Sequence, residues 1–515
     1  MVVESDDVNE EVAVEEFDLP DLLHADEYSV QFFQPIWEPF NADAERIVCR
    51  YLDQLGLPQT PKKTSKYRVV VASLLYAARK VVSANSRSVS EGSSEAKPVY
   101  LGAAMGHDNW TIFPLVGRDV VKRTINAFVD AGLLLKVEGS GQRHFYETDN
   151  GRVAYEAMMT MWQVNSALDD DPDLAEARFI ETGRPLVLVN VLETRNQKER
   201  RERFGEARKR LSHADCIRLF GDQYTASQAR VEALCAYWKQ HPLVFPDGSA
   251  VACATRVFSD GDMEVGGRLY GRWTNKKSEK RLEATIDGEP ILSLDIAASQ
   301  PTLLSVLLGV KLKISAYGTW YDVYTQLTNL WGYGATTEAW YERGDEIVKR
   351  NRTIAKGVVM ELIGTGNVNK AKPSVALVEK TNITQEEWDY FKAKIIEAVP
   401  AMLKLWPRYD SQGNVSGYIN GPAFLMYHES EIMMHTLERL RDDHDVPAYP
   451  VHDCLLVKEK DWEVGLTTFS QTISNYCVET SGTPVIVPIK REKRDGTKKT
   501  FRGYYDLDKH DQLSP

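Results

Sequence analysis

The sequence lacks the features that mark several specialised classes of protein. No C-x-x-C pair occurs among its cysteines, which argues against a zinc ribbon or a disulfide scaffold; the six lie at positions 49, 216, 235, 253, 454 and 477. Its longest apolar runs fall well short of the ~20 residues that a membrane-spanning helix needs. No basic segment followed by an apolar one opens the chain, so we expect a cytoplasmic protein with no membrane partner.

Basic residues are absent from positions 1–28, which hold eleven acidic side chains. The chain of 515 residues has 62 basic and 74 acidic side chains, a net charge of −12. Residues 29–515 therefore carry a net charge of only −1. Because a nucleic-acid partner is recognised by local basic clusters, the overall negative charge does not exclude one. We expect residues 1–28 to form a disordered acidic arm.

A helix and two strands are predicted between residues 118 and 147. In Asp119–Asp130 the apolar residues share one helical face, and the basic residues of this stretch fall largely on the other: Arg118, Lys122 and Arg123. Leu133–Val137 and Arg143–Glu147 are predicted to pair as a hairpin with a glycine-rich turn. This order is typical of a winged helix, whose helix enters the DNA major groove. A winged helix that contacts only proteins is the alternative.

Two segments in the second half of the chain each carry a carboxylate. Ile291–Leu304 starts as an apolar strand, which ends at Asp295 before a helix begins. Ala448–Lys458 has apolar runs on both sides of His452 and Asp453, which predicts a tight hairpin with these two residues at its tip. Two carboxylates on separate strands are what a two-metal phosphoryl-transfer site needs.

A helix predicted for Glu346–Ile363 contributes basic side chains. Arg352 and Lys356 lie four residues apart and so share one face, with Met360 one turn further. An arginine and a lysine fixed on one face are suited to the charge of a nucleoside triphosphate. An ordinary solvated helix face has the same pattern, so this segment is informative only together with the two acidic ones.

In their order along the chain, the acidic strand, the basic helix and the His-Asp hairpin resemble motifs A, B and C of the family A polymerases. This superfamily includes polymerase I-type DNA polymerases and single-subunit phage-type RNA polymerases. Asp262–Tyr270 (DMEVGGRLY) resembles the Asp-x-x-Gly-Arg element of the RNA polymerases, with Glu264 in place of the aspartate. Tyr427–Leu440 is similar to the helix that precedes motif C.

The resemblance implies a role for each matching residue. The ligands of two Mg²⁺ ions, or of Mn²⁺, would be Asp295, Asp453 and the backbone carbonyl of Ile296. The nucleotide would be bound by Arg352, Met360 and Lys356, the last of which would also act in catalysis. The primer and template would be contacted by His452, at the primer 3′ terminus, and by Arg268.

The sequence departs from the family pattern at two places. Gln300 stands where the DNA polymerases have a glutamate that blocks a 2′-hydroxyl and the RNA polymerases have a glycine. Because Gln300 is bulky, it favours a deoxynucleotide at this site. Gly364 and Thr365 stand where motif B has Tyr and Gly, whereas Met360 matches the RNA polymerases. The sequence therefore leaves both sugar selection and the control of the template base open.

These inferences predict an α/β (α+β) right-hand polymerase palm and fingers, preceded by a winged-helix domain and a mainly helical connecting region. The expected parts are the acidic arm at 1–28, the winged helix at 29–155, a helical connecting or thumb-like region at 156–250, a palm at 251–487 with a fingers insertion at about 305–400, and a basic C-terminal arm at 488–515.

The predicted function is template-directed DNA synthesis from a primer, in DNA replication of a phage or mobile element. Its partners would be a DNA template and primer and nucleoside triphosphates. A single-subunit RNA polymerase or a primase, with RNA as a partner, is an alternative of the same class. A non-catalytic winged-helix replication initiator or regulator with a relic palm is an alternative of another class. A metal-dependent nuclease ranks behind both, because it gives no reason for the basic helix.

Deleting residues 1–28 is expected to tighten DNA binding at low salt, because the acidic arm competes with DNA for the basic surfaces of the chain. The measurement is the DNA dissociation constant of the full chain and of the truncated chain over a salt series. Equal affinities at low salt would rule out this competition.

Overall fold

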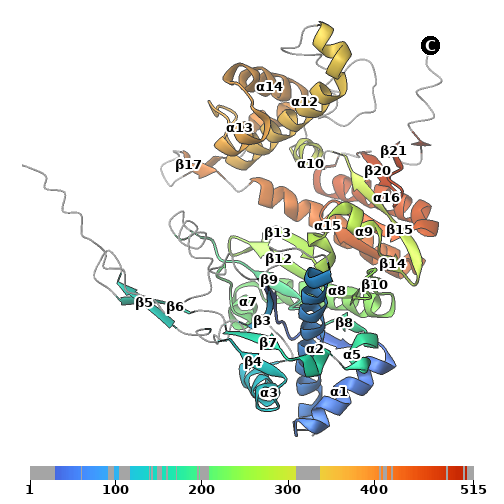
Figure 1. Ribbon diagram of the computed structural model, residues 1–515. Helices are drawn as coiled ribbons and strands as arrows, with labels where there is room; N and C mark the ends of the chain where they lie inside the picture. The colour runs from blue at the N-terminus through green and yellow to red at the C-terminus, as the bar shows by residue number, and fades with distance from the viewer. Residues whose placement is uncertain are drawn as a thin grey trace, which may run out of the picture. The chain divides into compact units, whose positions relative to one another are not determined.

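The computed structural model divides into two compact units, Met1–Phe179 and Ile180–Pro515, each described by itself (Figure 1). The predicted acidic arm at 1–28 lies outside the described residues. No helix in the described part of the chain is long and apolar enough to cross a membrane. The structure describes residues 29–58, 61–90, 98–103, 116–137, 140, 143–147, 153–157, 160–169, 171–193, 197, 208–297, 299–308, 337–404, 407–409, 415–418, 421–482, 485, 487–502 and 505–506.

The first unit is built on a sheet of four strands in the order β1-β3-β7-β4. Helix α2 (Pro61–Ser90) buries the apolar run Val69–Ala78 and packs against α1, α3 and this sheet. The other elements of the unit are β1 (Ser29–Phe32), β2 (Trp37–Pro39), α1 (Ala42–Gln54), β3 (Val99–Ala103), α3 (Arg118–Asp130), β4 (Leu134–Lys136), β5 (Arg143–Glu147), β6 (Val153–Ala157), β7 (Thr160–Val164), α4 (Ser166–Asp169) and α5 (Pro172–Glu176).

The hairpin predicted for Leu133–Val137 and Arg143–Glu147 is wrong. Both segments are strands, but β4 pairs antiparallel with β7 and β5 pairs antiparallel with β6. Pairing with β7 places Leu134, which is buried, opposite Val164. The local sequence shows where each strand lies, whereas its partner is decided by this apolar contact with a later strand.

The second unit is centred on strand β15 (Glu289–Ile296). Along one edge β15 pairs antiparallel with β19 (Cys454–Lys458), which in turn pairs with β18 (Ala448–Val451). β15 also pairs antiparallel with β14 (Thr285–Ile286) near its start and with β20 (Pro488–Glu492) along the edge opposite β19, and the sheet continues from β20 to β21 (Lys498–Arg502) and β22 (Tyr505–Asp506). Because β15 is enclosed on both sides, its residues Ile291–Leu294 are buried.

Helices α15 (Gly421–His444), α16 (Trp462–Ser481) and α10 (Ser299–Leu307) pack against one another beside this sheet. Helix α15 also packs along strand β13 (Asp262–Tyr270), which forms a smaller sheet with β12 (Thr255–Ser259) and β9 (Val187–Val189). The remaining elements are β8 (Phe179–Glu181), α7 (His213–Phe220), α8 (Asp222–Gln240), β10 (Leu243–Val244), β11 (Ala250–Val251), η2 (Arg272–Asn275), α9 (Ser278–Leu282), α12 (Thr337–Thr365), α13 (Val375–Thr381), α14 (Gln385–Ala398), η3 (Pro400–Lys404), β16 (Pro407–Tyr409), β17 (Val415–Tyr418) and η4 (Glu459–Asp461).

The observed architecture is a mixed α/β fold, as expected, but some predicted boundaries differ. The division between the units falls at residue 179 rather than 155, because β7 belongs to the sheet of the first unit. The region 156–250, predicted as mainly helical, also contains strands β7 to β11. Residues 488–502, predicted as part of a separate basic arm, form strands β20 and β21 of the central sheet, because β20 completes the hydrogen bonding of β15.

An aromatic cluster fixes the strand that leads to the His-Asp turn. Trp238 stacks on Tyr449 with ring centroids 5.0 Å apart, and Trp273 meets Tyr449 edge-on at the same distance. The two indole N–H groups donate to the carbonyls of Ala448 and Pro450, each at 2.7 Å. Strand β18 is therefore held through its backbone as well as its side chains, immediately before the turn.

Close packing of α15 against β13 depends on a glycine. Gly267 has φ +76°, and a Cβ there would lie 2.8 Å from Ser430 Oγ and 3.0 Å from the Phe258 ring. Gly482, at the end of α16, has φ +69° but would have no heavy atom within 4 Å of a Cβ. Substitutions at Gly267 and Gly482 therefore separate the effect of the backbone conformation from the effect of steric crowding.

Gly482→Ala is expected to cost about 1 kcal/mol through its backbone alone. Gly267→Ala is expected to cost about 1–3 kcal/mol more, because the added methyl group also separates α15 from β13. Urea unfolding of both variants tests this difference. Equal destabilisation would show that β13 and α15 have room to move apart.

Candidate active site

The structure brings Asp295 and Asp453 to one edge of the central sheet. Asp295 lies near the end of β15, where its Cα partner on β19 is Cys454, the residue after Asp453. The backbone N–H of Ile296 donates to the carbonyl of Asp453 at 3.2 Å. The turn between β18 and β19 includes His452 in the left-handed region, with φ +60°. As predicted, His452 and Asp453 occupy the tip of a tight hairpin.

A third carboxylate, which the sequence analysis did not assign, joins these two. Glu429 of α15 is 1% exposed, and its Oε1 lies 2.6 Å from Ser299 Oγ. The same Ser299 Oγ lies 2.9 Å from Asp453 Oδ2. One hydroxyl proton cannot serve two ionised carboxylates, because each of these only accepts hydrogen bonds. The cluster therefore needs a retained proton or a further positive charge.

The electrostatics of Asp295 lead to the same conclusion. Burial and the neighbouring charge of Asp453 raise the pKa of Asp295 to about 7, although Lys490 and Lys356 act in the opposite direction. Lys490 is the Cα partner of Asp295 on β20, and Lys356 is an exposed residue of α12. Burial and the charge of Asp453 likewise raise the pKa of Glu429. The site thus has an excess of buried negative charge that its lysines only partly offset.

Arg268 forms an ion pair with Glu429. Its Nε donates to Glu429 Oε2 at 2.9 Å, its Nη2 contacts the same oxygen, and the guanidinium is mostly buried. Sequence analysis assigned Arg268 to the template or primer backbone. In the structure this side chain instead links β13 to α15 through Glu429. Glu429 in turn contacts Ser299, which contacts Asp453.

Three other predicted residues surround the acidic cluster or lie beside it. The ring of His452 packs edge-on against Tyr270 at 5.7 Å, and burial followed by the charge of Arg268 lowers the pKa of the imidazole. Gln300, at the start of α10, is buried, and its Oε1 has no hydrogen-bond partner among the described residues. Met360 is half-buried on α12.

The predicted basic helix is present as part of α12, with Arg352 and Lys356 both exposed. Gly364 and Thr365, the two departures in motif B, lie at the C-terminal end of α12. A Cβ at Gly364 would come within 3.9 Å of Pro422 at the start of α15, so this end of α12 faces α15. The charge of Lys356, on this helix, lowers the pKa of Asp295.

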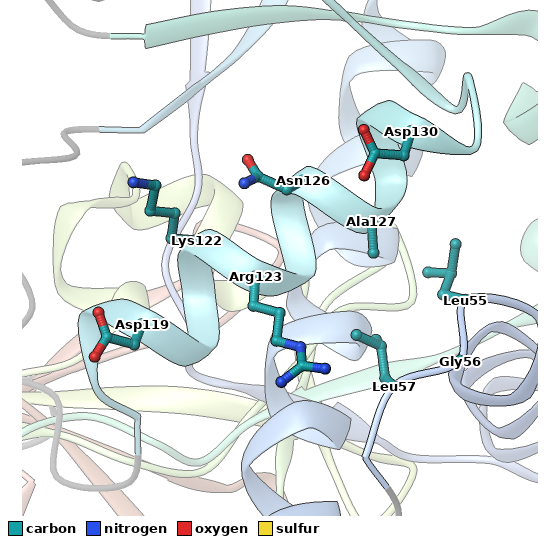
Figure 2. Close-up of a pocket in the computed structure, with 9 residues that line it drawn as sticks. All are labelled: Leu55, Gly56, Leu57, Asp119, Lys122, Arg123, Asn126, Ala127 and Asp130. Atoms are coloured by element: carbon teal, nitrogen blue, oxygen red, sulfur yellow. The ribbon is translucent and has the colours of Figure 1, made fainter.

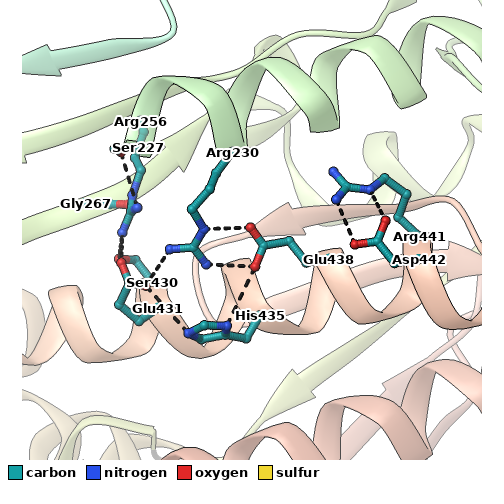
Figure 3. Close-up of polar contacts among 10 residues, drawn as sticks. All are labelled: Ser227, Arg230, Arg256, Gly267, Ser430, Glu431, His435, Glu438, Arg441 and Asp442. Carbon is teal, nitrogen blue, oxygen red and sulfur yellow. Dashed lines mark hydrogen bonds and ion pairs between the residues drawn. The ribbon is translucent and has the colours of Figure 1, made fainter. Parts of the chain in front are cut away.

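A network of buried ion pairs connects α15 to helix α8 and strand β12 (Figure 3). Arg230 of α8 donates to Glu438 through Nε at 2.6 Å and through Nη2 at 2.8 Å, and to Glu431 through Nη1 at 2.8 Å. Arg256 of β12, 2% exposed, also contacts Glu431 and donates to the carbonyl of Gly267 at 2.9 Å. Although burial opposes ionisation, the two arginines lower the pKa of Glu431. The network fixes the helix that carries Glu429.

In the first unit, α3 has the predicted two faces. Val121, Ile125 and Phe128 are buried, and the basic residues are exposed: Arg118, Lys122 and Arg123. A pocket of about 380 Å³ lies between this polar face and Leu55–Leu57, after α1 (Figure 2). Its charged lining residues are two acidic and two basic: Asp119, Asp130, Lys122 and Arg123. The pocket itself therefore has no excess of positive charge.

The donor set was compared with the needs of a divalent cation. No group of three or more His, Cys, Asp or Glu side chains within the described residues is arranged to hold a metal ion by itself. Asp295 and Asp453 nevertheless supply two carboxylates on adjoining strands, and oxygen ligands are those that Mg²⁺ prefers. A cation would also relieve the excess negative charge of the cluster. These residues fit Mg²⁺ bound by two carboxylates and completed by substrate or water.

No protein-family model matches the sequence, and no curated protein matches it. Sixty-nine chains of solved structures match. One is the POL domain of Pol1 from M. smegmatis, in complex with DNA primer-template and dNTP. It is 12% identical, with a TM-score of 0.32, and the match covers 61% of this chain and 58% of that chain. A likeness of this size establishes neither fold nor function, so the function is argued from the residues of the site.

Sequence reasoning missed three residues of the site: Glu429, Ser299 and Lys490. Ser299 comes only four residues after Asp295, so its position in the sequence already indicated that it lies near the site. Glu429 lies in the segment Tyr427–Leu440, where an acid within an otherwise apolar helical face was the signal. Lys490 could not be predicted from the neighbouring sequence, because only the pairing of β15 with β20 places it beside Asp295.

Arg268→Met is expected to destabilise the protein by about 3–5 kcal/mol, because it leaves the carboxylate of Glu429 buried without its partner. The double variant Arg268→Met with Glu429→Gln should lose less, since no unpaired charge remains. Urea unfolding measures both. Arg218→Met, which removes an exposed ion pair with Asp215, is the control and should stay within about 0.5 kcal/mol of the parent. A double variant less stable than Arg268→Met alone would contradict this account.

Proposed function

We propose that this chain is a template-directed nucleotidyltransferase that extends the 3′-hydroxyl of a DNA primer with deoxynucleoside triphosphates. One observation carries the proposal. Asp295 and Asp453, which are far apart in the sequence, meet on adjoining strands in a buried acidic cluster, and Lys356 lies near enough to affect the charge of Asp295. The order of the motifs along the chain supports the same reaction.

Asp295 and Asp453, with the backbone carbonyl of Ile296, would hold Mg²⁺. When bound, the ions would activate the attacking hydroxyl and stabilise the leaving pyrophosphate. The chain contributes by keeping the two carboxylates at fixed positions: hydrogen bonding of β15 to β19 fixes Asp295, and the aromatic cluster under β18 fixes the turn that carries Asp453. Such positioning is the main contribution of the protein in phosphoryl transfer.

The exposed basic residues of α12 would bind the triphosphate. Lys356 and Arg352 share a helical face, so both would reach phosphate oxygens from the same side. Lys356, the nearer to Asp295, would also stabilise charge on the leaving pyrophosphate. His452 would approach the primer 3′ terminus from the turn that carries Asp453.

Arg268 and Ser299 would act as positioning residues through Glu429. Ser299 contacts Asp453 directly, and Arg268 anchors the glutamate on the far side of Ser299. A preference for deoxynucleotides would follow from Gln300, whose bulk at the start of α10 would exclude a 2′-hydroxyl. The exposed basic face of α3 in the first unit would bind DNA.

Asp453→Asn and Asp295→Asn are each expected to reduce nucleotide incorporation at least ~10³-fold, because each removes a carboxylate of the metal-binding pair. Incorporation on a primed DNA template would be measured with dNTPs and NTPs separately, in Mg²⁺ and in Mn²⁺. Glu289→Gln is the matched control: it lies on the same strand, is partly exposed, and should retain full activity.

Each outcome distinguishes the candidates. Incorporation of NTPs in preference to dNTPs would replace the DNA polymerase with an RNA polymerase or primase. DNA binding without incorporation of any nucleotide in either metal would favour a replication initiator with a relic palm. Unchanged incorporation in Asp453→Asn would overturn the proposed mechanism.

A further inference from the structure

Two cysteines of the second unit lie together away from the acidic cluster. Cys235 is on α8, and Cys253 is in the short connection between β11 and β12. Their sulfur atoms are 3.0 Å apart. From this geometry we propose that Cys235 and Cys253 form an intramolecular, reversible disulfide when the protein meets a peroxide or a small-molecule disulfide. The proposal does not depend on the proposed function.

The surroundings assign the two cysteines different roles. Cys235 is partly exposed, whereas Cys253 is 1% exposed. Cys235 is thus the less buried residue of the two, so a small oxidant that enters from solvent would meet its sulfur before that of Cys253, which is the neighbouring thiol that completes the bond. The other buried cysteines are Cys216, Cys454 and Cys477, and none of them has a second sulfur atom in contact with its own within the described part of the chain.

The chemistry balances with hydrogen peroxide as the oxidant. The Cys235 sulfur attacks one peroxide oxygen, forms a sulfenic acid and releases water. The Cys253 sulfur then attacks the Cys235 sulfur, and its thiol proton leaves with the hydroxyl group as a second water. Two thiols and one peroxide thus give one disulfide and two waters, and a dithiol reductant reverses the change.

The hydrogen bond with the Cys253 thiol, followed by burial, raises the pKa of Cys235 well above its usual value. Since the thiolate is the attacking form, the first step is slow at neutral pH and becomes faster as the pH rises. The sulfurs must approach by only about 1 Å to reach the bonded separation of about 2 Å. The reaction therefore needs only a small relative adjustment of the two elements.

The disulfide would join the two elements that carry the arginines of the ionic network. Arg230 lies five residues before Cys235 on α8, and Arg256 follows Cys253 by three residues into β12. Both arginines contact Glu431 of α15. A covalent bond between α8 and the β11–β12 connection would therefore link the two elements that position Arg230 and Arg256.

The test treats the folded full-length protein with hydrogen peroxide at pH 7 and pH 9, blocks the remaining thiols, and maps its peptides without reduction. A peptide linking Cys235 to Cys253 should appear, with a loss of about 2 Da for the two hydrogens. It should form faster at pH 9 and disappear with dithiothreitol. Neither Cys235→Ser nor Cys253→Ala should give it, whereas Cys49→Ser, which removes an exposed cysteine of the first unit, should form it as the parent does.

The unfolding midpoint gives a second readout that is independent of the peptide map. The oxidised parent should unfold at a higher urea concentration than the reduced parent, and oxidation should not shift the midpoint of Cys235→Ser upward. Three results would overturn the proposal: unmodified Cys235 and Cys253 after treatment, Cys235 oxidised to the sulfinic acid with Cys253 still free, or a disulfide between two copies of the chain.

Discussion

The second unit is organised around the burial of negative charge at one edge of its central sheet. Asp295, Asp453 and Glu429 share this edge with one serine hydroxyl between two of them. Burying carboxylates costs several kcal/mol each unless cations compensate. Arg268 offsets Glu429 directly, and Lys490 and Lys356 act on Asp295. The remaining deficit of positive charge is the physical reason to expect a cation and a charged substrate at this place.

A site of this kind functions only if its carboxylates cannot move apart, and the surrounding structure restrains each of them separately. Hydrogen bonding on both edges of β15 restrains Asp295, and the Trp238–Trp273–Tyr449 cluster restrains the strand that leads to Asp453. Glu429 is restrained through α15, which two arginines hold by way of Glu431. The three restraints start from different elements, and β19 and Ser299 connect them.

The sequence predicted the parts of the site that depend on local pattern. An apolar strand ending in Asp295, a hairpin with His452 and Asp453 at its tip, and a helix carrying Lys356 were each expected and are present. It could not predict which strands pair when they lie far apart in the chain, because such pairing depends on apolar contacts that the local pattern does not reveal. For that reason β4 was given the wrong partner, Lys490 was missed, and Arg268 was not expected on Glu429.

The pairing of β15 has a consequence for synthesis of the chain on the ribosome. Both long partners of β15, β19 and β20, follow it only after α10, α12, α13, α14 and α15. Until those later strands emerge, β15 is paired only at its first two residues, with β14, and its buried apolar residues have no strand partner, the kind of surface that promotes aggregation. The acidic cluster therefore assembles late, and a truncated product that ends before β20 would expose an apolar edge instead of a finished sheet. Chaperone dependence during translation should be concentrated in this interval.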